Sequence, residues 1–382
     1  MLRRNLPPGG WFPALQDLYW DTTESNVPHA DMLFSPSLKK IEIHAALKWS
    51  RLGVPPGILP RLASTISALP TSSLERIEIG GGDRTIPWVY LKDSMSSIVL
   101  RCGASFTEYD SPVPLSDAAA NHLIQLPHLH TLCIHGPPPS YSTASLPLVF
   151  PPLKELTLKD GAARGWISLL ARLEDHASIT QAATPLSNVR ESLKSLRISG
   201  PSGIVIDASF VSPIQSFRNL VTLAIRVDCY DYEEDDEGQC AFKLNNDNVI
   251  ELATALTQLE SLFLGNVCSE NTCSTTVTCL LPISVHCVKL ENLEVHFNTT
   301  NIVNDFKDIL EDPQFQHLRS LPRCPLDCLY LSRTPLALDE PGFETVAKGM
   351  IDIFPSLVGF EGEVTGPAWG ELSDRIADIR KE

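Results

Sequence analysis

The sequence is poor in basic residues and in long hydrophobic runs. Of its 382 residues, 30 are Lys or Arg and 46 are Asp or Glu, which gives a net charge of −16. Nucleic acids and anionic membranes are bound through basic patches, so neither is expected as a main partner. No apolar run approaches the roughly 18 residues of a membrane span, and the N-terminus lacks the apolar segment of a signal peptide. We therefore expect a cytoplasmic or nuclear protein.

Signatures of common catalytic sites are also missing. The sequence contains no GxSxG, HExxH, Walker A or GxGxxG motif. Three glycines at 80–82 follow an apolar stretch, but the basic residue and helix start of a phosphate-binding loop do not follow in the right order. We interpret them as a turn. The sequence therefore predicts no enzymatic activity, no catalytic residue and no cofactor.

None of the ten cysteines has the CxxC spacing typical of zinc sites. In a reducing compartment disulfides are not expected, and the cysteines are interpreted as small buried residues. The best metal candidate is the pair Cys133 and His135, which would share one face of a strand with Thr131. A zinc site normally has four ligands, so this pair alone predicts no metal site.

One charge run stands out, YDYEEDDEG at 230–238. Its spacing is not that of an EF-hand, which needs Gly at position six and Glu at position twelve. Such runs are usually solvated loops. We interpret it as a loop, with a docking site for a basic peptide as the alternative.

The abundant feature is a recurring LxxLxL spacing, which FPPLKELTLKDG shows at Leu153, Leu156 and Leu158. Such a pattern is the core of the leucine-rich repeat, in which the last interval fits a strand. The first apolar residue of each expected copy is Leu15, Leu38, Leu74, Leu129, Leu153, Leu193, Leu220, Leu259, Leu290, Leu326 or Leu357, and DSMSSIVLRC adds a weaker copy that opens with Met95.

The segments between the copies predict helices. Intervals between first leucines vary and include 23 (15 to 38) and 40 (153 to 193), and the long ones need extra structure. Apolar residues three and four apart predict helices in five such segments, which are PGILPRLASTISAL, LSDAAANHLIQL, ARGWISLLARLEDH, NVIELATALTQL and ETVAKGMIDIF.

A strand and a helix in each repeat predict an α/β leucine-rich-repeat solenoid. Parallel strands lie about 4.8 Å apart, whereas helices are about 10 Å across, so stacking should bend the array. The parallel sheet is expected on the concave face and the helices on the convex face. Because no repeat can bury its apolar face alone, we predict one solenoid over residues 11–382 that ends in a helix, after a stub at 1–10.

Three passages resemble the leucine-rich-repeat region of fungal F-box proteins. They are FPPLKELTLKDG, NNDNVIELATALTQLESLFLGN and ETVAKGMIDIFPSLVGFEGEVTGPAWGEL, with Trp369 in the last, and the resemblance covers nearly the whole chain. It implies the substrate-recognition part of a ubiquitin ligase, whose partner is a protein. In that family an N-terminal F-box binds the adaptor Skp1.

The sequence departs from that family at its start, because a repeat motif, FPALQDLYW, begins at residue 12. No F-box fits before it, so Skp1 is an expected partner only if an F-box lies upstream. A truncated gene model is the explanation we favour, since terminal repeats normally need a polar cap. Loss of the domain, or action without Skp1, are the alternatives.

The side chains between the motif leucines should face the concave side and form the partner-binding surface. Such a surface mixes both charge signs with aromatic residues, and binding hot spots favour Tyr and Arg. The predicted partner-binding residues are Arg76, Glu78, Thr157, Lys159, Arg197, Arg226, Phe263, Glu294, His296 and Tyr330.

The function predicted on these grounds is a non-enzymatic protein-binding module. The alternative is a leucine-rich-repeat scaffold that regulates another enzyme, such as a GTPase activator. That role would need one exposed Arg or Asn aimed at a nucleotide, and the sequence marks out no residue for it.

Overall fold

The structure is a computed structural model with two compact units, Met1–Gly161 with Asp175–Ser192, and Ala162–Glu174 with Leu193–Glu382. The described residues are 12–22, 27, 32–44, 58–80, 88–136, 151–160, 163–179, 189–200, 204–227, 241–266, 273–331, 336–361 and 367–381. The acidic run at 230–238, the glycines after Gly80 and the N-terminal stub lie outside them.

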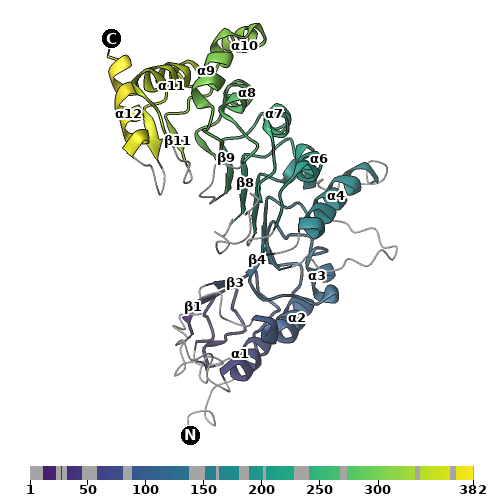
Figure 1. Cartoon of the computed structure of the whole chain (residues 1–382). Coiled ribbons are helices and arrows are strands. Elements are labelled where there is room, and N and C mark those ends of the chain that lie inside the picture. Colours follow the sequence, from purple (N-terminus) through teal and green to yellow (C-terminus); the bar gives the residue numbers. More distant parts are fainter. Residues whose placement is uncertain are drawn as a thin grey trace, which may run out of the picture. The chain divides into compact units, whose positions relative to one another are not determined.

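Each unit alternates strands with helices along the chain (Figure 1). The first contains β1 (Asp17–Asp21), β2 (Lys40–His44), α1 (Ile58–Ser67), β3 (Arg76–Gly80), η3 (Trp88–Leu91), α2 (Lys92–Arg101), β4 (Glu108–Ser111), α3 (Asp117–Leu123), β5 (Thr131–His135), β6 (Glu155–Lys159) and α5 (Val189–Ser192). Helix α4 (Ala163–Ile179) has residues in both units.

The second unit continues the alternation with six strands and a larger set of helices. They are β7 (Ser195–Gly200), η5 (Ala208–Phe210), α6 (Val211–Gln215), β8 (Thr222–Val227), α7 (Asn246–Ala255), β9 (Ser261–Asn266), η6 (Val277–Cys279), α8 (Leu280–His286), β10 (Asn292–Val295), α9 (Ile302–Glu311), α10 (Pro313–Arg319), β11 (Cys328–Tyr330), α11 (Glu340–Ile353), β12 (Gly359–Glu361) and α12 (Pro367–Ile379).

The strands of each unit pair in parallel and in sequence order, β1 to β6 in the first and β7 to β12 in the second. Their register aligns the second apolar position of every repeat. The aligned positions are Leu18, Ile41, Ile77, Tyr109, Leu132 and Leu156 in the first unit, and Leu196, Leu223, Leu262, Leu293, Leu329 and Phe360 in the second. This is the α/β leucine-rich-repeat fold, as predicted.

The three-then-two spacing has a physical cause in the turn before each strand. The amide of Leu38 donates to the carbonyl of Ser35 at 3.1 Å, which closes a tight turn. The Leu38 side chain is buried in the core. The next two amides, of Lys39 and Lys40, both donate to the carbonyl of Gln16 in the preceding repeat, at 2.7 and 2.9 Å. The strand thus begins two residues after the first leucine, and alternation follows from there.

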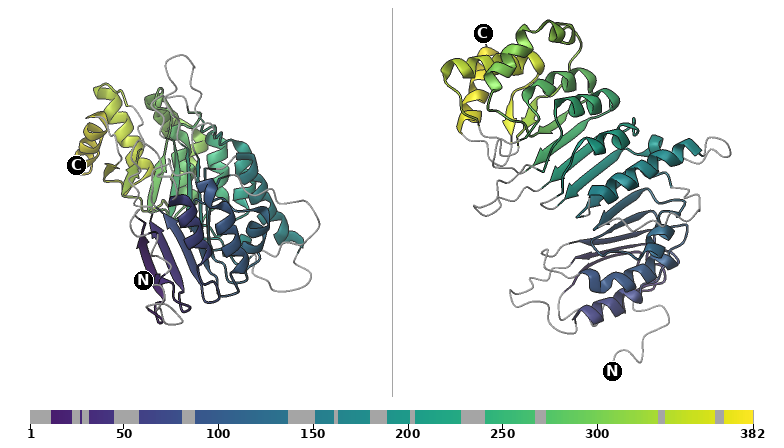
Figure 2. Two further views of the ribbon diagram at one scale, coloured as in Figure 1. Left: turned by 90° about the horizontal axis from the view of Figure 1, so that it is seen from below. Right: turned by 45° about the vertical axis from the view of Figure 1, so that its right-hand side comes forward.

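The helices cover one face of the sheet in each unit (Figures 1 and 2). Their apolar sides meet the inward-facing strand residues, and the first motif residue from Leu38 to Leu357 is at most 1% exposed in every described repeat. We call the sheet face without helices the open face; it is the face predicted as concave. None of the described helices is long and apolar enough to cross a membrane.

All five predicted helices are present, as α1, α3, α4, α7 and α11, and the C-terminal helix is α12. Continuity of a single solenoid over residues 11–382 stays a prediction. Ile134, expected in the core, is only half-buried.

One predicted repeat is wrong. DSMSSIVLRC forms helix α2 rather than a strand, and Met95 packs in the core from that helix. The missing strand is β4, in FTEYDS, where Phe106 takes the first position and Tyr109 the second. The error arose because aromatic residues replace both leucines there, while Met95 and Ile98 fit the helical as well as the repeat spacing.

Alanine is expected to destabilise the protein at Gly349, where α11 packs on α9, and to stabilise it at Gly370 on α12. An added Cβ at Gly349 would lie 2.3 Å from Cδ1 of Phe306, a fully buried ring. Gly349→Ala should therefore lower the free energy of unfolding by about 1–3 kcal/mol through overpacking. Gly370→Ala, with nothing within 4 Å, should raise it by about 0.5–1 kcal/mol through helix propensity. Urea unfolding of both variants is the measurement. If both substitutions changed the free energy of unfolding in the same direction, the result would contradict this packing.

Candidate functional site

The open face carries most of the residues predicted to bind a partner. Strand alternation sends their neighbours inward, and these side chains are half-buried or exposed on the opposite side of the strand. They are Arg76, Glu78, Thr157 and Lys159 in the first unit and Arg197, Arg226, Phe263, Glu294 and Tyr330 in the second. Their role in binding a partner stays a prediction.

His296 does not belong to this surface. Its side chain is 0% exposed, between the buried residues Val295 and Phe297. Strand β10 ends at Val295, so the two-residue alternation that placed His296 outward stops one residue before it. The prediction that His296 faces a partner is wrong.

In the second unit most of the open-face residues, though not Arg226, lie in one row across the sheet. The register places in line Arg197, Ala224, Phe263, Glu294, Tyr330 and Glu361, one from each strand from β7 to β12. With strands about 4.8 Å apart, five spacings give a row about 24 Å long. Arginine stands at one end, a carboxylate at the other, and aromatic rings between them.

A three-residue cluster lies at the middle of this row. It consists of Phe263 and Glu294 from the row and of Arg226, which lies two residues after Ala224 on β8. Arg226 Nη2 donates to Glu294 Oε2 at 2.6 Å, from β8 to β10, across the intervening strand β9. On β9, Phe263 places its ring 5.1 Å below the guanidinium carbon of Arg226. Arg226 is 57% exposed, whereas Glu294 is 14% exposed. The cluster therefore fixes a guanidinium on the surface and leaves much of it accessible.

Toward the end of the row, Tyr330 lies beside Glu361. Hydrogen bonding to Glu361 raises the pKa of Tyr330, and the charge of the carboxylate adds to the effect. The phenol therefore stays neutral at physiological pH and keeps a hydrogen to donate. Cys328, on the same strand, has its pKa raised to about 11 by burial and then by Glu361, so it is not a reactive thiolate.

The first unit has a different open face, with three carboxylates in adjacent strands. Glu42, Glu78 and Asp110 are aligned by the register of β2, β3 and β4. Like charges directly opposite are destabilising in a sheet, and cations lie beside this row. Arg76 pairs with Glu78 and, at 3.2 Å, with Glu108, and the hydrogen bond to Glu78 raises the pKa of Arg76.

A shallow pocket of about 470 Å³ lies over this region. Its lining comes from β3 to β6 and is polar, with side chains of both charge signs, including Arg76, Glu108, His130, Lys154 and Glu155. Such a lining suits polar or charged groups rather than an apolar ligand.

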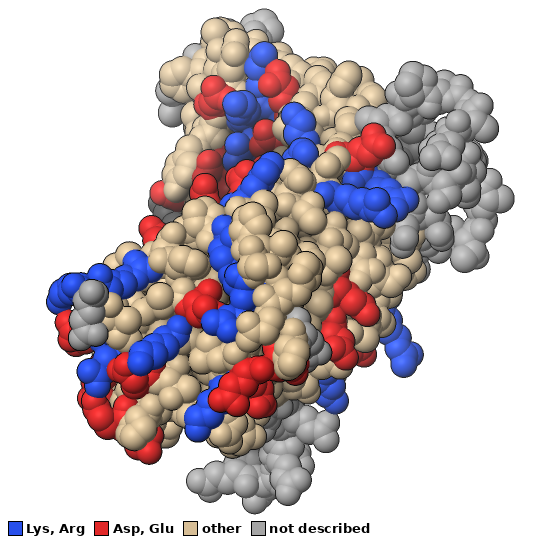
Figure 3. Space-filling view, turned by 90° about the horizontal axis from the view of Figure 1, so that it is seen from above, with Lys and Arg blue, Asp and Glu red and all other residues tan. Residues whose placement is uncertain are grey.

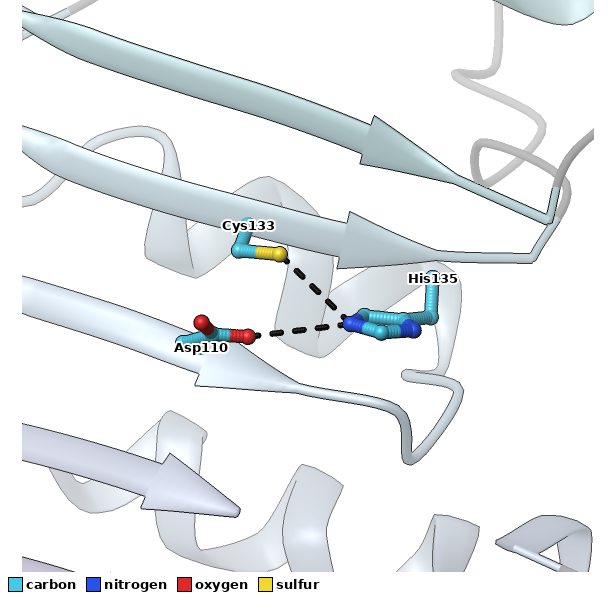
Figure 4. Close-up of side chains that lie close together, drawn as sticks. All are labelled: Asp110, Cys133 and His135. Carbon is cyan, nitrogen blue, oxygen red and sulfur yellow. Dashed lines mark hydrogen bonds and ion pairs between the residues drawn. The ribbon is translucent and has the colours of Figure 1, made fainter. Parts of the chain in front are cut away.

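Beside the pocket, three side chains converge at the ends of β4 and β5 (Figure 4). The Nε2 atom of His135 lies 3.5 Å from Sγ of Cys133 and 3.6 Å from Oδ1 of Asp110. Burial would raise the pKa of Asp110, but hydrogen bonds from His135 and Cys133 and the charge of Lys159 outweigh it, and the pKa is lowered. Burial, with a smaller contribution from Asp110, raises the pKa of the Cys133 thiol.

The sequence pointed to Cys133 and His135 but missed Asp110. Asp110 lies on β4, the strand without leucines, so nothing in a leucine pattern placed it next to β5. The signal that could have found it is the F-x-x-Y-x-S spacing of residues 106–111, which keeps the repeat intervals with other residue types. Charged side chains of both signs are interspersed over the described surface seen in Figure 3.

No protein-family model matches the chain, and no curated protein matches it. Among solved structures, a crystal structure of Rad7 and Elc1 in complex, from yeast, is 12% identical over 86% of this chain and 80% of that chain, with a TM-score of 0.34. An internalin, InlF from Listeria monocytogenes str. 4b F2365, is 14% identical over 83% of this chain and 81% of that one, with a TM-score of 0.36.

Proposed function

We propose that the chain is a protein-binding module whose second unit holds an extended segment of a partner protein along the row from Arg197 to Glu361. The observation that carries this proposal is the accessible guanidinium of Arg226, fixed between Phe263 and Glu294. Arginine and aromatic side chains are enriched in binding hot spots, and rigid ones lose little entropy on binding.

The row also defines the chemistry of the partner. An extended segment advances about 3.3 Å per residue, so about seven residues span 24 Å. Its acidic side chains would lie toward Arg197 and Arg226, the guanidinium of which covers Phe263, an apolar side chain would lie beside Tyr330, and a basic side chain would lie toward Glu361. This pattern is polar at both ends and apolar in the middle, as interfaces commonly are.

Charge reversal tests this surface. Arg197→Glu combined with Arg226→Glu is expected to weaken binding of the partner about 10- to 100-fold, because two positive contacts become repulsive. The partner is recovered from extract with the full chain, purified, and its affinity for each variant measured by calorimetry.

Arg218→Glu is the matched control. Arg218 is exposed in the turn before β8 and is not part of a strand of the open face, and the change alters net charge by the same amount per site. It should bind the partner as the unaltered chain does. Equal affinity of the double variant and the control would refute the proposal.

The resemblance to F-box proteins supports a finer role, the substrate-recognition part of a ubiquitin ligase receptor. In that role the partner is a substrate, and Skp1 takes part only through an F-box. Cells that express the double variant should then degrade the bound protein more slowly than cells that express Arg218→Glu. Unchanged degradation alongside weakened binding would leave the binding module standing and exclude the ligase role.

A further inference from the structure

The cluster at the ends of β4 and β5 has the dimensions of a metal site. Around a tetrahedral zinc ion, a sulfur at about 2.3 Å and a nitrogen at about 2.05 Å lie about 3.6 Å apart, and nitrogen and oxygen ligands about 3.4 Å apart. The observed separations are 3.5 Å for Cys133 Sγ to His135 Nε2 and 3.6 Å for His135 Nε2 to Asp110 Oδ1. All three ligand atoms lie within 4.8 Å of one another. We propose that Asp110, Cys133 and His135 bind a zinc ion.

A second carboxylate lies behind the histidine. The other ring nitrogen of His135, Nδ1, is 3.6 Å from Oδ2 of Asp160. Histidine ligands almost always give their second nitrogen to a carboxylate or carbonyl, which fixes the tautomer and turns the free lone pair toward the metal. Asp160 follows β6 directly and has a left-handed backbone, with φ of 55°, which few residues other than glycine adopt. Asp160 is therefore a positioning residue for His135.

The charges of the cluster suit a divalent cation. With Cys133 as a thiolate, Asp110, Cys133 and Asp160 contribute three negative charges, and Lys159, which interacts with Asp110 and Cys133, contributes one positive charge. The sum is −2. Cys133 is 3% exposed and His135 is 17% exposed, so water competes little for these two ligands. Because burial favours the thiol form, binding of the ion releases the thiol proton to solvent.

The ligand types select zinc over the harder cations. Thiolate with imidazole suits zinc, whereas magnesium and calcium prefer all-oxygen sites. A neighbouring group on the same face, Glu42, His44 and Glu78, also has its possible ligand atoms within 4.8 Å of one another but contains no thiol. Its members are already paired, Glu42 with His44 at 2.7 Å and Glu78 with Arg76, so it serves as the internal comparison.

Three protein ligands leave the fourth tetrahedral position open. Zinc sites with three protein ligands hold water or an incoming ligand there, whereas closed structural sites use four. The site lies in the first unit, and its existence does not depend on partner binding by the second unit.

Cobalt and zinc titrations of the chelator-treated full chain test the site. Cobalt(II) should bind one equivalent and give the near-ultraviolet absorption of a thiolate ligand, which zinc then displaces. Cys133→Ser should abolish this absorption, and His135→Gln and Asp110→Asn should each weaken zinc binding at least tenfold. Asp160→Asn should weaken it about tenfold while the thiolate absorption remains.

Two variants are the controls. Cys328→Ser removes a thiol of the second unit and His44→Gln disrupts the comparison group, and both should bind as the unaltered chain does. If Cys133→Ser fails to fold, His135→Gln, whose side chain is partly exposed, decides the matter in its place. Absence of a thiolate absorption in the unaltered chain, or zinc affinity that His135→Gln and Asp110→Asn leave unchanged, overturns the proposal.

Discussion

Replacing Trp369 with alanine is expected to lower the free energy of unfolding by about 3–5 kcal/mol, the range for deleting a buried aromatic side chain. The indole is 1% exposed. It packs on Phe360 of β12 with ring centroids 4.9 Å apart, and edge-on against Phe297 at 6.3 Å. Trp369 thereby holds α12 against β12.

Urea unfolding followed by circular dichroism measures this loss. Val358→Ala, in the same repeat at a side chain 65% exposed, is the control and should change stability by no more than about 0.5 kcal/mol. A loss below about 1 kcal/mol for Trp369→Ala would contradict the packing of α12 on β12.

Phe106→Ala is expected to have an effect of similar size, about 3–5 kcal/mol, in the first unit. Phe106 is 0% exposed and opens the repeat that contains β4, the position that Leu74 and Leu129 take in the adjoining repeats. Because the position is built for an apolar side chain of about leucine size, Phe106→Leu should lose at most about 1.5 kcal/mol.

The two substitutions at residue 106 are compared by the same unfolding measurement. Leu100→Ala, on α2 with 47% exposure, provides the surface control. If Phe106→Leu were as damaging as Phe106→Ala, this position would not be a variant of the leucine position, and the assignment of the repeat would be wrong.

The repeat class followed from the sequence because two local rules act together. A turn that is closed by a hydrogen bond to the residue three positions earlier places the first leucine, Leu38, in the core. Strand alternation then places Ile41 and Ile43 on the same buried side of the strand. The spacing of the three residues therefore reflects the local geometry of the turn and the strand. Where aromatic residues took those places, at Phe106 and Tyr109, the leucine pattern gave no signal. The same stretch shows that the intervals persist when the residue types change.

The candidate site was predictable in part. Alternation placed Arg226, Phe263 and Glu294 on one face correctly, because each lies inside a strand. It failed for His296, because a strand end depends on the packing of the chain beyond it, and Val295, His296 and Phe297 are all buried.

The sequence by itself determined the repeat unit, its parallel strands and the side of each strand that faces the helices. Only the tertiary structure decided which open-face side chains touch. Arg226 meets Glu294 across β9, 68 residues away in sequence, and Asp110 meets His135 from the neighbouring strand. The physical reason is that repeats of unequal length separate neighbouring strands by unequal stretches of chain. The hydrogen-bond register, and not sequence spacing, therefore brings one strand's side chains beside those of the next.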